Sequence, residues 1–192
     1  MTLPDRAGPP PAHSDYGLNP PGGPSAGALL RALQAQEVSH VVTVPDFVQF
    51  ALHERLRDPA CSLKQVFCCS EDQALTTAGG LHVGGARPML MMQNQGLAKC
   101  INTLRAVCLD GGAPLVMMVG QFGREPENFG RPTRESARTL VRITEPLLEA
   151  LGVRYWNLAG DEGIACVAEA FAHAEAVRSA AVVLVDRHIT WQ

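Results

Sequence analysis

Several features that would assign this chain to an easily recognised class are missing from its sequence. No apolar run approaches the roughly 20 residues that a membrane-spanning helix needs, and no basic segment followed by an apolar one marks a signal peptide. The net charge of −3 gives no electrostatic case for binding nucleic acid or an anionic membrane. With 46% hydrophobic and 18% charged residues, the 192-residue chain is instead expected to form a globular domain with a real core.

Motifs for metals and for common nucleotides are missing as well. The six cysteines form no C-x-x-C pair and the six histidines have no metal-ligand spacing, so no metal site is predicted in this chain. Most cysteines fall within apolar patterns, which favours free thiols and a cytoplasmic location. There is no G-x-x-x-x-G-K-[ST] loop, no G-x-G-x-x-G after the first strand and no G-x-S-x-G elbow. A nucleophilic Cys69 with His82 as its base would need the fold to bring them together, and nothing in the sequence indicates that.

Proline and glycine are concentrated at the N-terminus. Residues 1–26 hold half of the 14 prolines together with several glycines, so this segment cannot bury much surface. We expect a disordered arm over residues 1–26 and one folded domain over residues 27–192. The arm could bind a partner, although a solvated leader is the simpler interpretation.

Beyond the arm, short apolar runs alternate with helical patterns. Strands are predicted over residues 40–44, 63–69, 87–93, 113–119, 153–158 and 180–185. Helices are predicted over residues 28–36, 47–57, 71–83, 96–109, 136–151 and 161–177. This alternation predicts an α/β fold with one doubly wound, mostly parallel sheet. Runs such as MLMM and VVLV are apolar on both sides, as expected for strands that helices cover on both faces.

Polar residues follow three of the predicted strands. Pro45 and Asp46 follow the first, Glu71 follows the second, and residues 93–96 follow the third. Glu71 also lies within an S-x-x-Q capping box (Ser70 to Gln73), in the first turn of a helix, where the macrodipole favours a carboxylate by roughly 0.3–1 kcal/mol. Each segment by itself could be a simple turn with a cap. Because parallel strands end at the same edge of a sheet, the three together predict a site there.

The order and spacing of several short motifs resemble those of the pyrimidine-binding (PYR) domain of thiamine-diphosphate enzymes. The chain is most similar to the alpha subunit of sulfopyruvate decarboxylase and to the N-terminal half of phosphonopyruvate decarboxylase. The motifs are VPD at 44–46, SED-x-A at 70–74, MQNQGL at 92–97, INTL at 101–104, APLVMMVG at 113–120 and ITEPLLEALGV at 143–153.

The resemblance implies a catalytic role for Glu71. The matching glutamate hydrogen-bonds ring nitrogen N1′ of the cofactor's aminopyrimidine, which favours the imino tautomer that removes the proton from the thiazolium ring. Pro45 and Asp46 would line the aminopyrimidine pocket or its rim. Near the cofactor or substrate, the resemblance places Asn94, Gln95 and Gly96.

Two further residues are candidates for contact with the substrate, namely Gln93 and Arg124. A guanidinium group matches the geometry of sulfonate, phosphonate or carboxylate. Arg124 lies in the polar loop after the fourth predicted strand, residues 113–119. An exposed loop residue is the simpler interpretation of Arg124. Relatives commonly read QNSGLGN at the positions of residues 93–99, whereas this chain has Ala98 and Lys99 at the last two positions. The resemblance therefore does not define the local turn here.

The resemblance also implies that this chain carries half of an active site. The GDG motif that holds Mg²⁺ and the diphosphate is missing, so a separate diphosphate-binding (PP) subunit with that motif is expected, in a hetero-oligomer such as α2β2 or larger. The implied activity is decarboxylation of an anionic 2-oxo acid of the sulfopyruvate or phosphonopyruvate type. The alternatives are a carboligase of the acyloin or acetolactate synthase type, a non-catalytic regulatory subunit, and an α/β domain unrelated to thiamine.

Overall fold

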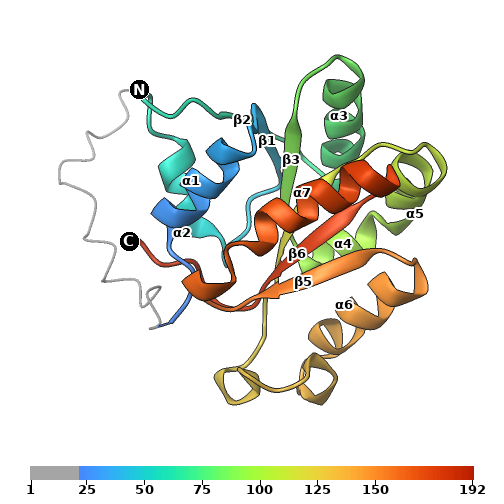
Figure 1. Ribbon diagram of the computed structural model, residues 1–192. Coiled ribbons are helices and arrows are strands. Elements are labelled where there is room, and N and C mark those ends of the chain that lie inside the picture. The colour runs from blue at the N-terminus through green and yellow to red at the C-terminus, as the bar shows by residue number, and fades with distance from the viewer. Residues whose placement is uncertain (1–21) are drawn as a thin grey trace, which may run out of the picture.

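A six-stranded parallel sheet forms the centre of the protein, whose computed structural model describes residues 22–192 (Figure 1). The strand order is β2-β1-β3-β4-β6-β5, and every neighbouring pair is parallel. The strands are β1 (His40–Thr43), β2 (Lys64–Phe67), β3 (Pro88–Gln93), β4 (Val116–Gly120), β5 (Arg154–Leu158) and β6 (Ala181–Val185). The predicted α/β fold with a single parallel sheet is therefore confirmed.

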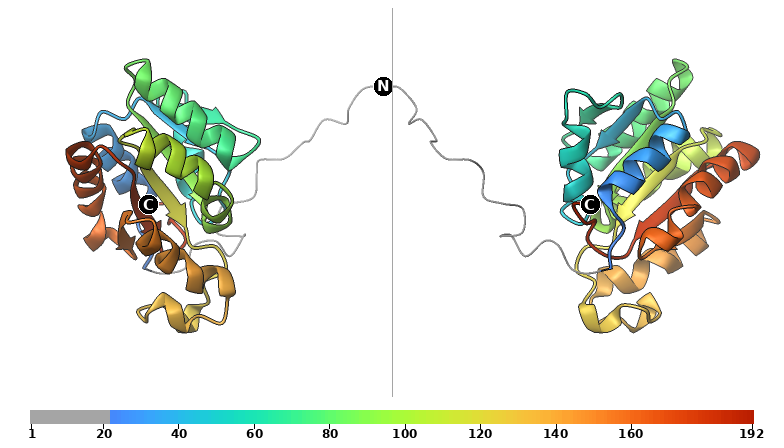
Figure 2. Two further views of the ribbon diagram at one scale, coloured as in Figure 1. Left: turned by 90° about the vertical axis from the view of Figure 1, so that its right-hand side faces the viewer. Right: turned by 60° about the vertical axis from the view of Figure 1, so that its left-hand side comes forward.

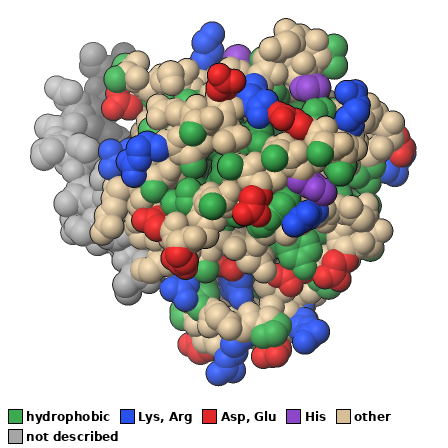
Figure 3. Space-filling model, in the orientation of Figure 1, with side chains coloured by type: hydrophobic (Ala, Val, Ile, Leu, Met, Phe, Trp, Pro, Cys, Tyr) green, Lys and Arg blue, Asp and Glu red, His purple; other side chains and the backbone are tan. Residues whose placement is uncertain are grey.

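Helices cover both faces of this sheet, as Figure 2 shows from two sides. One face packs against α1 (Ala26–Ala35), α2 (Phe50–Leu56) and α7 (Cys166–Val177). The other face packs against α3 (Glu71–Val83), α4 (Asn94–Lys99), α5 (Ile101–Leu104) and α6 (Thr139–Ala150). None of the helices in the described part of the chain is long and apolar enough to cross a bilayer. Acidic and basic side chains are interspersed over the face drawn in Figure 3.

Strand β3 shows why the central strands have no polar face in the sequence. Met89 and Met91 of β3 contribute to the core beneath α1, α2 and α7, whereas Leu90 and Met92 contribute to the core beneath α3 to α6. All four side chains are fully buried. Alternation along a strand thus divides one apolar run between two cores.

Helix α3 has the bounds that the sequence predicts. Ser70 Oγ accepts a hydrogen bond from the Gln73 backbone N–H at 3.3 Å, and the Gln73 side-chain oxygen accepts one from the backbone N–H of Cys69 at 2.9 Å. These two bonds fix the start of α3 directly at Glu71.

The single helix predicted over residues 96–109 is wrong. The chain leaves the helical conformation at Cys100 (φ −94°, ψ 18°), between α4 and α5. A π-helical segment, Arg105–Asp110, follows, and Gly111 N–H bonds to the carbonyl of Ala106, five residues earlier. Periodicity could not reveal this, since the apolar face stays continuous across the break.

Part of the predicted N-terminal arm falls within the described residues. Residues 1–21 of the predicted arm lie outside the described residues. Its last two residues belong to the fold, because Ser25 forms a β-bridge with Thr190 and Ala26 is buried in α1. The backbone N–H of Ser25 also donates to Asp161 at 2.6 Å.

The double-sided burial of β3 predicts a high sensitivity to loss of volume. Leu90→Ala should lower the free energy of unfolding by about 2–5 kcal/mol, because it removes contacts and leaves a cavity. Val83→Ala, at a side chain that is 85% exposed, is the control and should change it by less than about 0.5 kcal/mol. Urea denaturation measures both, and equal effects would contradict this view of the core.

Candidate active site at the carboxyl edge of the sheet

The segments predicted to form a site meet at one edge of the sheet. Strand β1 pairs in parallel with both β2 and β3, so the three strands end side by side. Pro45 and Asp46 follow β1, Glu71 begins the helix after β2, and Asn94 begins α4 directly after β3. The structure therefore brings these residues together on the edge where α/β sheets bind their ligands.

Glu71 lies against α4 with almost no space between them. A Cβ atom added to Gly96 would overlap the Glu71 side chain and lie 2.7 Å from its carboxylate oxygen Oε1. The Glu71 side chain is only 15% exposed, and its Oε2 atom lies 3.4 Å from Nζ of Lys99. Glycine at position 96 thus allows α4 to pack on the carboxylate.

Asp46 is buried and fully engaged by its own turn. Its carboxylate accepts hydrogen bonds of 2.8 Å from the backbone N–H of Val48 and from the side-chain amide of Gln49. Burial raises the pKa of Asp46 to about 6, although these bonds oppose the shift. A Cβ atom at Gly120 would overlap this carboxylate, so a glycine at the end of β4 makes room for it.

Two residues that the sequence did not single out complete this turn. The amide of Gln49 also donates to the carbonyl of Met118 at 3.1 Å, and Nε2 of His53 accepts the backbone N–H of Asp46 at 3.2 Å. Burial lowers the pKa of His53 to about 4, so its ring is neutral at physiological pH. The side-chain nitrogen of Gln65 lies 2.8 Å from the other ring nitrogen, Nδ1. The helical spacing of Asp46, Gln49 and His53 is the sequence signal that could have linked them.

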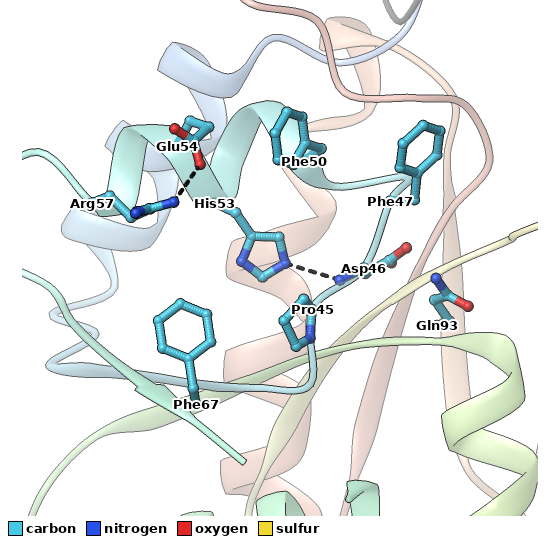
Figure 4. Close-up of a pocket in the computed structure, with 9 residues that line it drawn as sticks. All are labelled: Pro45, Asp46, Phe47, Phe50, His53, Glu54, Arg57, Phe67 and Gln93. Carbon is cyan, nitrogen blue, oxygen red and sulfur yellow. Dashed lines mark hydrogen bonds and ion pairs between the residues drawn. The ribbon is translucent and has the colours of Figure 1, made fainter. Parts of the chain in front are cut away.

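A cavity of about 310 Å³ opens beside this turn (Figure 4). Figure 4 shows Phe67, at the end of β2, pointing toward the ring of His53. Glu71 is not among the residues that line the cavity, so the carboxylate and the cavity are separate features of one edge. The lining is largely aromatic and consists of Pro45, Asp46, Phe47, Phe50, His53, Glu54, Arg57, Phe67 and Gln93.

The remaining predicted residues of this edge differ in accessibility. Asn94 is buried, with its amide donating to the carbonyl of Phe122 at 3.3 Å and its side-chain oxygen left without a hydrogen-bond partner. Gln95 is exposed, and Gln93 is half-buried at the cavity wall. Asn94 and Gln93 therefore turn toward the protein, whereas Gln95 faces outward.

Arg124 does not have the position predicted for a substrate contact. Its side chain is 4% exposed and forms an ion pair of 2.5 Å with Asp186. It also donates to the side chain of Asn128 at 3.1 Å and to the carbonyl of Arg131 at 2.8 Å. Because its donors are already used within the protein, Arg124 supports the loop after β4 rather than offering a free guanidinium group.

The structure also tests the other chemistries considered for the sequence. Cys69 precedes α3 and His82 lies in its last turn, so about 18 Å of helix separates them and they form no nucleophile pair. Within residues 22–192, no group of three His, Cys, Asp or Glu side chains could hold a metal ion.

Comparison with known proteins identifies the family. Residues 25–140 match the model of the thiamine pyrophosphate enzymes, N-terminal TPP binding domain. The chain belongs to this family. No curated protein sequence matches the chain.

Solved structures of thiamine-diphosphate enzymes share the fold of this TPP-binding domain. The 4-hydroxybenzoylformate decarboxylase of Rhodococcus jostii RHA1 matches with a TM-score of 0.65 and 16% identity. The benzoylformate decarboxylase of Polynucleobacter necessarius matches with a TM-score of 0.66 and 17% identity. In both comparisons 84% of this chain is covered but only 29% of the other one, so this chain spans less than a third of their length.

The carboxyl edge of this TPP-binding domain fits the aminopyrimidine end of thiamine diphosphate. It presents a largely buried carboxylate at Glu71, which can bond to a ring nitrogen. The described residues hold no metal cluster for a diphosphate–Mg²⁺ pair.

The contact between Gly96 and Glu71 predicts a coupled effect on stability. Gly96→Ala should lower the free energy of unfolding by about 1–3 kcal/mol through overpacking. In a Glu71→Ala background the overlap is gone, and the same change should raise it by up to about 1 kcal/mol, since alanine favours the helix.

Gly80→Ala in α3 is the matched control for this cycle. A Cβ atom there would meet nothing within 4 Å, so this change should stabilise both backgrounds by about 0.5–1 kcal/mol. Additive effects of the changes at positions 71 and 96, measured by urea denaturation, would contradict the contact.

Burial of Asp46 predicts a pH dependence with a definite sign. Its folded pKa of about 6 lies above the ordinary aspartate value of 3.8, so its contribution to stability is present below about pH 4 and is lost as the pH rises through about 6. The free energy of unfolding of Asp46→Asn, minus that of the wild type, should therefore increase by roughly 2–3 kcal/mol between pH 4 and pH 7. His53, with a lowered pKa, acts in the opposite direction in both proteins and cancels in this difference. A difference that stays flat across this range would contradict the assignment.

Proposed function

We propose that this chain is the pyrimidine-binding subunit of a two-subunit, thiamine-diphosphate-dependent 2-oxo acid decarboxylase. The observation that carries the proposal is the placement of Glu71, a largely buried carboxylate at the carboxyl edge of a TPP-binding domain. When bound, thiamine diphosphate supplies the electron sink for the electrons released with carbon dioxide.

In this proposal each residue of the chain has a limited task. Glu71 shares a proton with ring nitrogen N1′ of the aminopyrimidine, and Gly96 lets the backbone of α4 lie close to it. Asn94 is buried at the start of α4, and its amide supports the loop after β4 through the carbonyl of Phe122. Pro45 and Asp46 form the rigid turn beside the site, and Gln95 faces outward from α4.

A partner subunit is part of the proposal because the enzyme that this chain resembles divides its active site between two subunits. The proposed PP subunit supplies the GDG motif that holds Mg²⁺ and the diphosphate, in an α2β2 or larger assembly. Phe67, Phe47 and Phe122 are 57%, 48% and 40% exposed. Phe67 is the last residue of β2, and Phe47 and Phe122 lie in the segments that follow β1 and β4. Exposed aromatic rings are typical of surfaces that another protein covers, which supports a partner on this edge. A cytoplasmic location is also proposed, supported by six free cysteines.

For the substrate we propose an anionic pyruvate derivative of the sulfopyruvate or phosphonopyruvate type, on the strength of the motif resemblance. Arg124 is not available to bind its anionic group. Arg57 lies at the cavity wall, paired with Glu54 at 3.1 Å, and Lys99 lies beside Glu71. These two cations, or residues of the partner, are then the candidates for that contact.

Co-expression with a GDG-bearing PP subunit tests the proposal. With thiamine diphosphate and Mg²⁺, the complex should release carbon dioxide from one member of a panel of 2-oxo acids. Glu71→Gln should lower the rate by about 10²–10⁴-fold, because the amide cannot share a proton with N1′. Glu127→Gln, at an exposed glutamate of the loop after β4, is the charge-matched control and should leave the rate unchanged.

The other outcomes of this experiment are informative. Product that contains a second carbonyl compound would identify a carboligase. Cofactor binding without turnover of any kind would indicate a regulatory subunit, and full activity of Glu71→Gln would sink the proposed role of this residue.

A further inference from the structure

Lys99 lies beside Glu71, and the proposed function names it only as one candidate for contact with the substrate. It stands where related sequences commonly have the asparagine of QNSGLGN. Its ammonium group lies 3.4 Å from Oε2 of Glu71, and this is the one ion pair of Glu71 among residues 22–192. The residue that differs from related sequences, Lys99, is therefore in direct contact with the Glu71 carboxylate.

The two ends of α4 act on Glu71 in different ways. Gly96 presses backbone against the Glu71 side chain, and Lys99 lies about one helical turn later on the same side of α4. The packing at Gly96 is rigid, because no side chain there can move away. The Lys99 side chain is 55% exposed on a flexible stem, so it can leave the carboxylate at little cost.

We propose that Lys99 is a displaceable counter-ion of Glu71, which pairs with the carboxylate in the cofactor-free chain and gives way to the aminopyrimidine nitrogen of thiamine diphosphate. Lys99 is then a positioning residue that holds Glu71 extended along α4 and weakens cofactor binding by the free energy of the pair. The identity of the incoming group rests on the proposed function, whereas the pairing itself does not.

The pairing can be measured on the full-length chain without cofactor or partner. The chain has only two lysines, Lys64 and Lys99, and Lys64 is exposed on β2. Acylation followed by mass spectrometry therefore yields the reactivity of Lys99 with Lys64 as an internal reference. An amine held against Glu71 is shielded from the reagent, whereas a released one is accessible to it. Glu71→Gln should raise the ratio of Lys99 to Lys64 labelling about two- to fivefold, as expected for a partly exposed pair, and an unchanged ratio would overturn the pairing.

The displacement can be measured as a dissociation constant of thiamine diphosphate in the complex with the PP subunit, at fixed Mg²⁺. Lys99→Met removes the competing charge and should lower the dissociation constant about two- to fivefold. Lys99→Arg keeps the charge and should stay near the wild type, and Lys64→Met is the matched control. Tighter binding is not a result that mere damage to the fold would produce.

The results separate this inference from the proposed function. A wild-type complex that binds cofactor, with a dissociation constant unchanged or raised by Lys99→Met, would overturn the inference alone. A complex that binds no cofactor would overturn both, even if labelling shows the pair. Cofactor that raises Lys99 labelling in the wild-type complex would support displacement directly.

Discussion

The candidate site depends on the parallel pairing of β1 with both β2 and β3. In a parallel sheet every strand ends at the same edge, so segments far apart in the sequence deliver their first residues to one place. Helices on both faces are the necessary counterpart, because a strand such as β3 is apolar on both sides and must be covered twice. Burial of the central strands by helices on both faces thus determines where the candidate site residues come together.

The edge itself is stiffened by buried polar groups rather than by apolar packing alone. Asp46, Gln49 and His53 bond to one another and to the backbone of neighbouring strands, which fixes the turn after β1. Buried polar groups destabilise a fold unless they are satisfied, so such a cluster defines one conformation of the turn more strictly than apolar contacts would. Next to this rigid turn, Glu71 has one partner that does not move, Gly96, and one that can, Lys99.

The sequence was informative wherever a local pattern decides the structure. The apolar runs identified all six strands, and the capping box identified the start of α3 at Glu71. Contacts between distant residues could not be seen in this way. The break at Cys100 leaves no mark in the local pattern, and the ion pair of Arg124 with Asp186 joins the loop after β4 to the residue directly after β6. The sequence therefore gave no sign that the guanidinium group of Arg124 is paired, because Asp186 lies too far along the chain for a local pattern to link the two.

The contact of Glu71 with Gly96 also bears on how this protein can change over time. Any side chain at position 96 collides with the glutamate, and any shortening at position 71 opens a gap beside the glycine. A substitution at either position therefore changes the free energy of unfolding by an amount that depends on the residue at the other position. The two positions are therefore expected to vary together, even though they lie on different helices.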